Sequence, residues 1–270
     1  MSAPAATAPG SATPLRVPRS RWFADAMTIA WRNVLNLRRN PELLVFATIQ
    51  PIIFVLMFRY VFGGAIRVPG VPYVDYLMPG IFVQTVVFGS LTTGVGLAED
   101  LQKGIIDRFR SLPMARSAVL VGRTFADLLR NTFVVALMAV VGYVVGWRPD
   151  QSALSILAGL GLVLAFAYSL SWLFAYVGLS ARNGETAQAI SFPILAPLVF
   201  ASSAFVPIES MPPWLQTFAE HQPVTFVVDA VRGLTYGGAT TGEVLGAVAW
   251  IVAIVAIFAP LSVWKYRRVV

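Results

Sequence analysis

The sequence lacks cysteine altogether and has a single histidine, His221. Without cysteine the chain forms no disulfide, builds no thiolate metal site and has no cysteine nucleophile. The zinc-hydrolase motif HExxH is absent too. A single histidine, in a segment that we predict to lie on the outer side of a membrane, disfavours a zinc site or an intramembrane serine–histidine pair. We therefore interpret His221 as an interfacial packing residue rather than a proton shuttle. The phosphate-binding pattern GxxxxGK(S/T) is also missing, so the chain has no nucleotide site of that kind.

Charged residues are scarce as well. They make up 12% of the chain, half of the ~25% typical of soluble domains. Hydrophobic residues make up 57%, and the mean hydropathy is +0.72. This composition predicts an all-α polytopic membrane protein with no sizeable soluble domain. The formal net charge of +7 would suggest nucleic acid in a soluble protein. Here the cations cluster at the ends of apolar runs, where they set orientation and attract anionic headgroups, so we expect no nucleic-acid partner.

Long apolar runs separated by polar loops predict six membrane spans, because about 20 apolar residues cross a bilayer. The predicted spans are 43–62, 76–98, 117–146, 152–180, 187–206 and 243–264, which together make a transmembrane domain over 43–264. The segment 207–242 carries several charges, and as a further span it would put the basic end 265–270 outside. We therefore expect short external or re-entrant helices in 207–242.

The chain ends are predicted to be cytoplasmic, because short basic segments stay on the cytoplasmic side of the plasma membrane. Residues 1–20 are rich in Ala, Pro and Thr without hydrophobic periodicity, which predicts a disordered cytoplasmic tail. Residues 21–39 separate apolar and polar residues at helical spacing and predict an amphipathic helix on the membrane surface. Residues 265–270 form a basic cytoplasmic end.

The loop 99–116, EDLQKGIIDRFRSLPMAR, is a charged island between the second and third predicted spans. Leu101, Ile105, Phe109 and Leu112 recur at spacings of four, four and three and share one face of a helix. Charged residues occupy the opposite face at ion-pair spacing. Such a helix either presses on a cytoplasmic partner or rests on the lipid headgroups, and the spacing alone does not separate these two interpretations.

Three charged residues fall in the early turns of the third predicted span. Arg123, Asp127 and Arg130 lie on one helical face at spacings of four and three. A charge at mid-bilayer costs about 2.5–3.5 kcal/mol on insertion scales, so mutual pairing near the cytoplasmic end is expected. A structural ion cluster is the simpler interpretation, and a gating role is the alternative.

Four stretches resemble motifs of one transporter family. They are RNPELL at 39–44, LMPGIF at 77–82, GIIDRFRSLPMAR at 104–116 and PPWLQTFAEHQPVTFVVDAVRGL at 212–234. In this order they resemble the type-2 ABC exporter permeases, above all the daunorubicin/doxorubicin-resistance group. The similarity extends over about residues 22–268.

The resemblance implies six spans, a connecting helix at 21–39 and re-entrant helices before the last span. It makes the island helix a coupling helix seated on a separate ABC ATPase, two copies of which serve two permeases, identical or paralogous. ATP and Mg would bind the ATPase, and this chain would need no cofactor. The residues assigned to coupling are Leu101, Gly104, Ile105, Asp107, Arg108, Phe109, Arg110 and Leu112.

The implied function is export of lipophilic or amphiphilic compounds, as in drug or antibiotic efflux, by alternating access. A substrate drawn from the inner leaflet is expected to contact Phe54, Phe58, Gln84 and Phe88, although core packing is the simpler role for each aromatic. The expected partners are therefore the ATPase, a second permease, membrane lipids and a lipophilic substrate. An exporter of lipid or polysaccharide is the nearest alternative, and a membrane-embedded enzyme is the distant one.

Overall fold

The computed structural model describes residues 27–28, 31, 35, 41–64, 66, 68, 70–105, 116–238 and 241–269. Within these ranges the chain forms helices and turns and no strand, which confirms the all-α prediction. The elements are α2 (Pro41–Leu56), the π-helical turn η1 (Met57–Phe62), α3 (Tyr73–Gln102), α5 (Arg116–Val145), α6 (Ala153–Ser180), α7 (Gly184–Phe200), the 3-10 turn η2 (Ile208–Ser210), α8 (Pro213–His221), α9 (Pro223–Tyr236) and α10 (Thr241–Val269).

The predicted tail 1–20 and most of the predicted connecting helix 21–39 lie outside the described residues. The four positions of 21–39 that the structure describes include Met27 and Trp31, which are helical and exposed. The basic end continues α10 as far as Val269.

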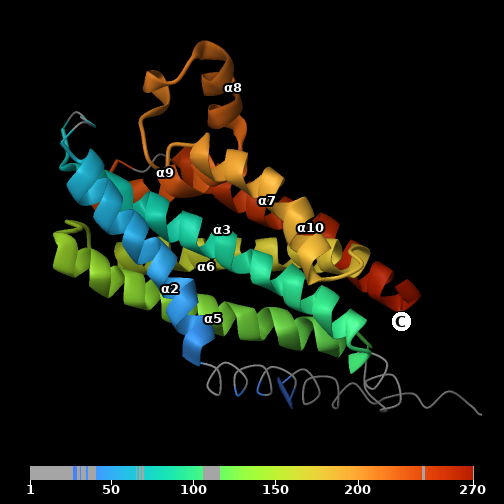
Figure 1. Ribbon diagram of the computed structural model, residues 1–270. Coiled ribbons are helices and arrows are strands. Elements are labelled where there is room, and N and C mark those ends of the chain that lie inside the picture. The colour runs from blue at the N-terminus through green and yellow to red at the C-terminus, as the bar shows by residue number, and fades with distance from the viewer. Residues whose placement is uncertain are drawn as a thin grey trace, which may run out of the picture.

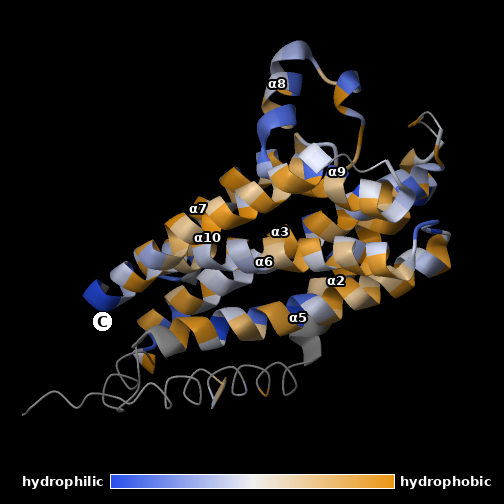
Figure 2. Cartoon of the chain, turned by 180° about the vertical axis from the view of Figure 1, so that it is seen from behind, coloured by the Kyte–Doolittle hydropathy of each residue, from blue (hydrophilic) through white to orange (hydrophobic). Residues whose placement is uncertain are grey.

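Four of the described helices are long and apolar enough to cross a membrane: α3, most of α5, α6 and α10. The apolar helix Ala47–Phe62, in α2 and η1, is shorter. Hydrophobic colour covers the long helices in Figure 2, whereas the C-terminal end of α10 is hydrophilic. The chain is therefore a multi-pass membrane protein.

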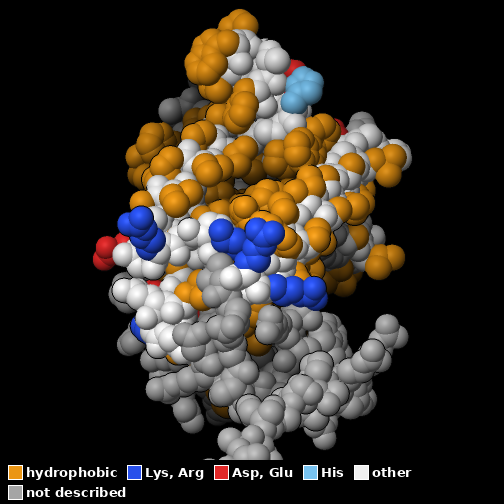
Figure 3. Space-filling model, turned by 90° about the vertical axis from the view of Figure 1, so that its right-hand side faces the viewer, with side chains coloured by type: hydrophobic (Ala, Val, Ile, Leu, Met, Phe, Trp, Pro, Cys, Tyr) orange, Lys and Arg blue, Asp and Glu red, His pale blue; other side chains and the backbone are white. Residues whose placement is uncertain are grey.

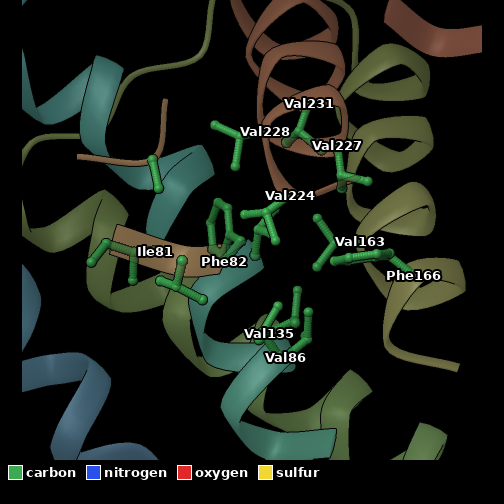
Figure 4. Packing of buried hydrophobic residues seen from close by; sticks show 14 of the residues in the cluster. Ile81, Phe82, Val86, Val135, Val163, Phe166, Val224, Val227, Val228 and Val231 are labelled. Carbon is green, nitrogen blue, oxygen red and sulfur yellow. The ribbon is translucent and has the colours of Figure 1, made fainter. Parts of the chain in front are cut away.

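Helix α3 occupies the centre of the bundle. It packs against α2, α5, α6, α7 and α9, while α10 packs against α6 and α9. Figure 1 shows α3, α5, α6, α7 and α10 running along one another, with α2 crossing the bundle at an angle. Figure 4 shows part of the packing at the centre: Ile81, Phe82 and Val86 of α3, Val135 of α5, Val163 and Phe166 of α6, and Val224, Val227, Val228 and Val231 of α9.

Glycines allow α3 and α6 to approach backbone to backbone. A Cβ atom added to Gly178 of α6 would lie 2.3 Å from the carbonyl oxygen of Gly94 on α3. A Cβ added to Gly94 would in turn lie 2.6 Å from the carbonyl oxygen of Phe174. Small residues at such a contact provide close van der Waals packing where the hydrophobic effect no longer drives helix association.

Helix α7 is shorter than the predicted span 187–206, because it ends at Phe200 and the chain then turns. Side chains bind the backbone carbonyl groups that the helix no longer satisfies. The Tyr76 hydroxyl donates to the carbonyl oxygen of Ser203 at 2.9 Å, and the Arg232 guanidinium donates to the same oxygen at 2.8 Å. Since a buried carbonyl needs a partner, these contacts allow the helix to stop inside the bundle.

Within 207–242 the chain forms the short helices η2, α8 and α9, and α10 begins at Thr241. The external or re-entrant placement of the short helices stays a prediction. Helix α9 buries one face completely, with Val227, Val228 and Val231 fully inaccessible to solvent. Helix α8 projects away from the packed helices in Figure 1 and exposes Trp214 and Phe218.

Candidate coupling and transport sites

The charged island begins where α3 ends. Gly104 has φ +64, in the left-handed region that glycine adopts at little cost, and its N–H donates to the carbonyl oxygen of Leu101 at 3.1 Å. This glycine stops α3 and redirects the chain. Of the predicted coupling residues, Leu101, Gly104 and Ile105 are described; Asp107, Arg108, Phe109, Arg110 and Leu112 lie outside the described residues.

The last turn of α3 touches two other helices. Asp100 forms an ion pair with Arg123 of α5. Glu99 forms an exposed ion pair with Lys103 at 2.9 Å. Glu99 also lies against the start of α7, since a Cβ added to Gly184 would be 3.0 Å from its Cγ. A displacement of the loop after α3 would therefore act on α5 and α7 together.

The three charges predicted to form one cluster on α5 form two separate pairs. Arg130 pairs with Asp127 at 3.4 Å, whereas Arg123 pairs with Asp100 of α3 instead of with Asp127. Spacing within α5 does not reveal this partner, because the carboxylate comes from α3, which packs beside α5. Gly96 of α3 makes room for Arg123, because a Cβ there would lie 2.1 Å from a terminal nitrogen of the guanidinium.

The deeper pair is tied to α3 by further hydrogen bonds. The Thr93 hydroxyl donates to Asp127 at 2.6 Å. Arg130 donates to the carbonyl oxygen of Gly89 at 2.7 Å and to the hydroxyl of Thr92. The side chains of Asp127 and Arg130 are each 14% exposed, so this is a largely buried charge pair with hydrogen-bond partners on α3. The available sequence signal for this network was the pair of consecutive threonines, Thr92 and Thr93, within an apolar span.

An aromatic cluster joins α2, η1 and the end of α7. Phe58 stacks on Phe205 with ring centroids 4.7 Å apart, and Phe54 lies 6.2 Å from the same ring. Phe62 lies 5.3 Å from Phe58, and Phe200 stacks on Phe205 at 5.6 Å. We refer to Phe54, Phe58, Phe62, Phe200 and Phe205 as the aromatic cluster.

The structure does not bring the four predicted substrate-path residues to one place. Phe54 and Phe58 belong to the aromatic cluster, but Phe88 contacts Phe192 of α7 at 6.1 Å. Gln84 is 2% exposed inside the core, and its Oε1 has no hydrogen-bond partner in the described structure. In this conformation Gln84 faces protein rather than an open path.

A buried polar network holds α9 against α3 and the end of α7. Arg232 pairs with Asp229 at 2.6 Å, and the Ser203 hydroxyl donates to Asp229 at 2.7 Å. The guanidinium of Arg232 also lies 3.7 Å over the ring of Tyr76. Burial raises the pKa of Asp229, and the charge of Arg232 opposes that shift. Asp229 and Arg232 are two of the charges in the segment 207–242, and their spacing of three was the signal for a pair within one helix.

Some polar groups outside the α9 network have structural partners. Asp75, in the first turn of α3, accepts hydrogen bonds from the Tyr236 hydroxyl at 2.7 Å and from the backbone N–H of Arg148 at 3.1 Å. His221 is exposed at the end of α8, with Nδ1 2.9 Å from the carbonyl oxygen of Thr217. No three carboxylate or imidazole groups in the described ranges are placed to hold a metal ion.

Comparison with known proteins identifies the family. The family model for ABC-2 type transporters matches residues 25–236, from before α2 to the end of α9. The chain belongs to this family. The match covers the island, both charge pairs, the aromatic cluster and the α9 network.

Individual relatives of this ABC-2 chain are permeases. It is 34% identical over 253 residues to the daunorubicin resistance ABC transporter permease protein DrrB1 of Streptomyces coeruleorubidus, covering 94% of this chain and 89% of that protein. It is 28% identical over 268 residues to the probable doxorubicin resistance ABC transporter permease protein DrrC of Mycobacterium tuberculosis, covering 94% of each chain. The putative transport permease ycf38 of Cyanophora paradoxa is 27% identical over 219 residues, 79% of this chain and 74% of that protein.

Proposed function

We propose that this ABC-2 chain is the membrane permease of an ABC exporter that carries lipophilic or amphiphilic compounds, drugs or antibiotics among them, out across the plasma membrane. The observation that carries the proposal is the near full-length similarity to two permeases named for daunorubicin or doxorubicin resistance. Export by alternating access fits a bundle whose helices are joined by discrete polar contacts at both ends.

The proposed topology has six spans: α2 with η1, α3, α5, α6, α7 and α10, within the transmembrane domain 43–264. Both chain ends and the island lie in the cytoplasm. Support comes from the end of the bundle where α3 and α10 finish, which carries a row of Lys and Arg side chains in Figure 3. On this topology α8 and α9 belong to the outer side, and α9 is a re-entrant helix that dips back among α3, α6 and α10.

The proposed partners are two copies of a separate ABC ATPase and a second permease, identical or paralogous. ATP and Mg would be held by the ATPase, and no cofactor by this chain. The island helix, with Leu101, Gly104 and Ile105 at its start, would sit on the ATPase. Support for the coupling role comes from the last turn of α3, where Asp100 contacts α5 and Glu99 contacts α7.

In the proposed mechanism the ATPases close on ATP and push the coupling helices. Arg123 pairs with Asp100 of α3, and Arg130 donates hydrogen bonds to Gly89 and Thr92 of α3, so α3 and α5 would move as one unit. That movement would close the inner side of the path and open the outer side.

The decisive experiment is ATP-driven export by the permease reconstituted with its proposed ABC ATPase subunit. Inside-out vesicles should accumulate daunorubicin with ATP, and should fail to do so when the phosphate-loop lysine of the ATPase is replaced by alanine. Uptake of a lipid-linked saccharide in place of any drug would favour the alternative exporter. Lack of all ATP-dependent uptake would contradict the proposal.

A further inference from the structure

The first half of α3 is enclosed on every side. Each residue from Tyr73 to Val87 is buried, whereas buried and partly exposed residues are mixed from Phe88 to Gln102. A helix that is buried all round has no face left for lipid or for a passing compound. On the proposed topology this is the outer half of α3. Passage of a compound along α3 to the outer side therefore requires that one of the covering elements moves away.

The turn 201–206, which follows α7, covers one side of this half. It lies directly on the α3 backbone, because a Cβ added to Gly80 would be 2.0 Å from the carbonyl oxygen of Ala204. One turn earlier in α3, the Tyr76 hydroxyl donates to the carbonyl oxygen of Ser203 at 2.9 Å. The turn is thus held against α3 by close backbone contact and by a hydrogen bond.

Helix α9 covers another side, and Arg232 joins it to both neighbours. Its guanidinium donates to the carbonyl oxygen of Ser203 at 2.8 Å and to that of Tyr76 at 3.2 Å. On α9 itself it pairs with Asp229, which accepts a hydrogen bond from the Ser203 hydroxyl at 2.7 Å. The α9 network of Tyr76, Ser203, Asp229 and Arg232 therefore connects three elements at one point.

The other neighbours of α9 hold it by apolar packing. A Cβ added to Gly159 of α6 would lie 3.7 Å from Cγ1 of Val231, and one added to Gly246 of α10 would lie 2.5 Å from the ring of Phe226. Helix α9 therefore belongs with α6 and α10, whereas α3 is proposed to move with α5. The α9 network lies on the boundary between these two units, so a relative movement must break its contacts.

The closed arrangement also leaves polar atoms unsatisfied. The Nε atom of Arg232 is buried without a hydrogen-bond partner in the described structure. Gln222, at the start of α9, donates to the carbonyl oxygen of Ala201 at 2.7 Å, but its Oε1 atom is buried without a partner as well. Because unsatisfied buried groups cost free energy, this arrangement is less stable than a fully paired network would be. Contacts that open and close during a transport cycle need such a limited stability.

We propose that the α9 network is a lock that keeps the outer half of α3 closed, and that its opening is a step of export. Movement of α3 with α5 would draw Tyr76 away from Arg232 and Ser203, while α9 stays with α6 and α10. Tyr76 and Arg232 are then positioning residues that set how much of the protein is closed. The inference rests on the proposed export function. The opposite case is a permanent brace, in which α3, the turn and α9 move as one body.

The absence of cysteine allows the lock to be tested with a single reporter. Val228 is fully buried and precedes Arg232 by four residues, so both lie on one face of α9. Val228→Cys is reacted with a hydrophilic maleimide in the permease–ATPase complex in nanodiscs, without nucleotide and after trapping with ATP and vanadate. The trapped complex should react about tenfold faster, because the open fraction sets the rate. Leu120→Cys, buried beside Tyr266 at the other end of the bundle, should stay protected in both states.

The contribution of the lock itself is measured with Tyr76→Phe, which removes the hydroxyl that binds Ser203 and keeps the ring beneath Arg232. Without nucleotide, this change should speed the labelling of Val228→Cys about fivefold, as expected for one lost hydrogen bond, and leave Leu120→Cys protected. Tyr143→Phe is the matched control, because Tyr143 is exposed and lies outside the α9 network; labelling should not change. A permanent brace predicts a less heat-stable Tyr76→Phe with unchanged labelling.

Two results would overturn the lock. One is a Val228→Cys variant that stays unlabelled in the trapped complex although drug uptake proceeds, and this result leaves the export proposal standing. The other is an equal labelling rate with and without Tyr76→Phe. If Tyr76→Phe fails to fold, the comparison of the free and trapped complexes decides alone. Faster labelling with Tyr76→Phe, in a permease that drives no ATP-dependent uptake, would support the lock and count against export.

Discussion

At the scale of single residues, Gly178 tests how closely α3 and α6 must approach. Gly178→Ala places a methyl group 2.3 Å from the carbonyl oxygen of Gly94, so the helices must separate, at a cost of about 1–3 kcal/mol. We expect lower thermal stability of the detergent-purified protein, measured by fluorescence-detected size exclusion after heating. Gly161→Ala on the same helix is the control, because a Cβ there has no atom within 4 Å. Equal melting of both variants would contradict the backbone contact.

The pair Asp100–Arg123 tests whether charges join α3 to α5. Asp100→Asn leaves the largely buried Arg123 without its carboxylate, so export and stability should both fall. The double variant Asp100→Asn, Arg123→Gln should recover part of the loss, because it leaves no unpaired charge. The control is Lys103→Gln, which breaks the exposed ion pair with Glu99, leaves the contact of Glu99 with α7 in place and should have little effect. A double variant that is worse than both single variants would show that the two residues act separately.

At the scale of elements, the island helix is the candidate contact with the ATPase. Its sequence places Phe109 on the apolar face, so Phe109→Ala should weaken ATPase binding, with a typical cost of 2 kcal/mol or more, roughly, for an aromatic at a contact centre. Asp107→Arg should also weaken ATPase binding, because it would place like charges against the partner. Drug uptake and drug-stimulated ATP hydrolysis should fall at unchanged membrane expression. Wild-type values for both variants would instead indicate a helix that rests on headgroups.

At the scale of the whole molecule, the absence of cysteine makes topology directly measurable. We expect an impermeant thiol reagent added to intact cells to label Glu209→Cys in η2 and not Ser111→Cys in the island. Permeabilised cells, in which both should react, provide the control. Labelling of Ser111→Cys alone in intact cells would invert the proposed orientation.

The sequence by itself determined the class of fold and the approximate positions of the long helices. Composition and the length of the apolar runs are sufficient for this, because a bilayer demands continuous apolar helices. It also marked Arg123, Asp127 and Arg130 as charges in need of partners, since helical spacing is a local property. The coupling role of the island residues from Asp107 to Leu112 likewise remains a prediction from the sequence.

Only the tertiary structure decided which partners meet. Arg123 binds Asp100 because α5 lies antiparallel to α3, a relation that no spacing within one helix reveals. The early end of α7 at Phe200 depends on Tyr76 and Arg232, side chains far away in sequence that bind the freed carbonyl of Ser203. Both outcomes depend on contacts between elements, which the order of residues along one helix does not reveal.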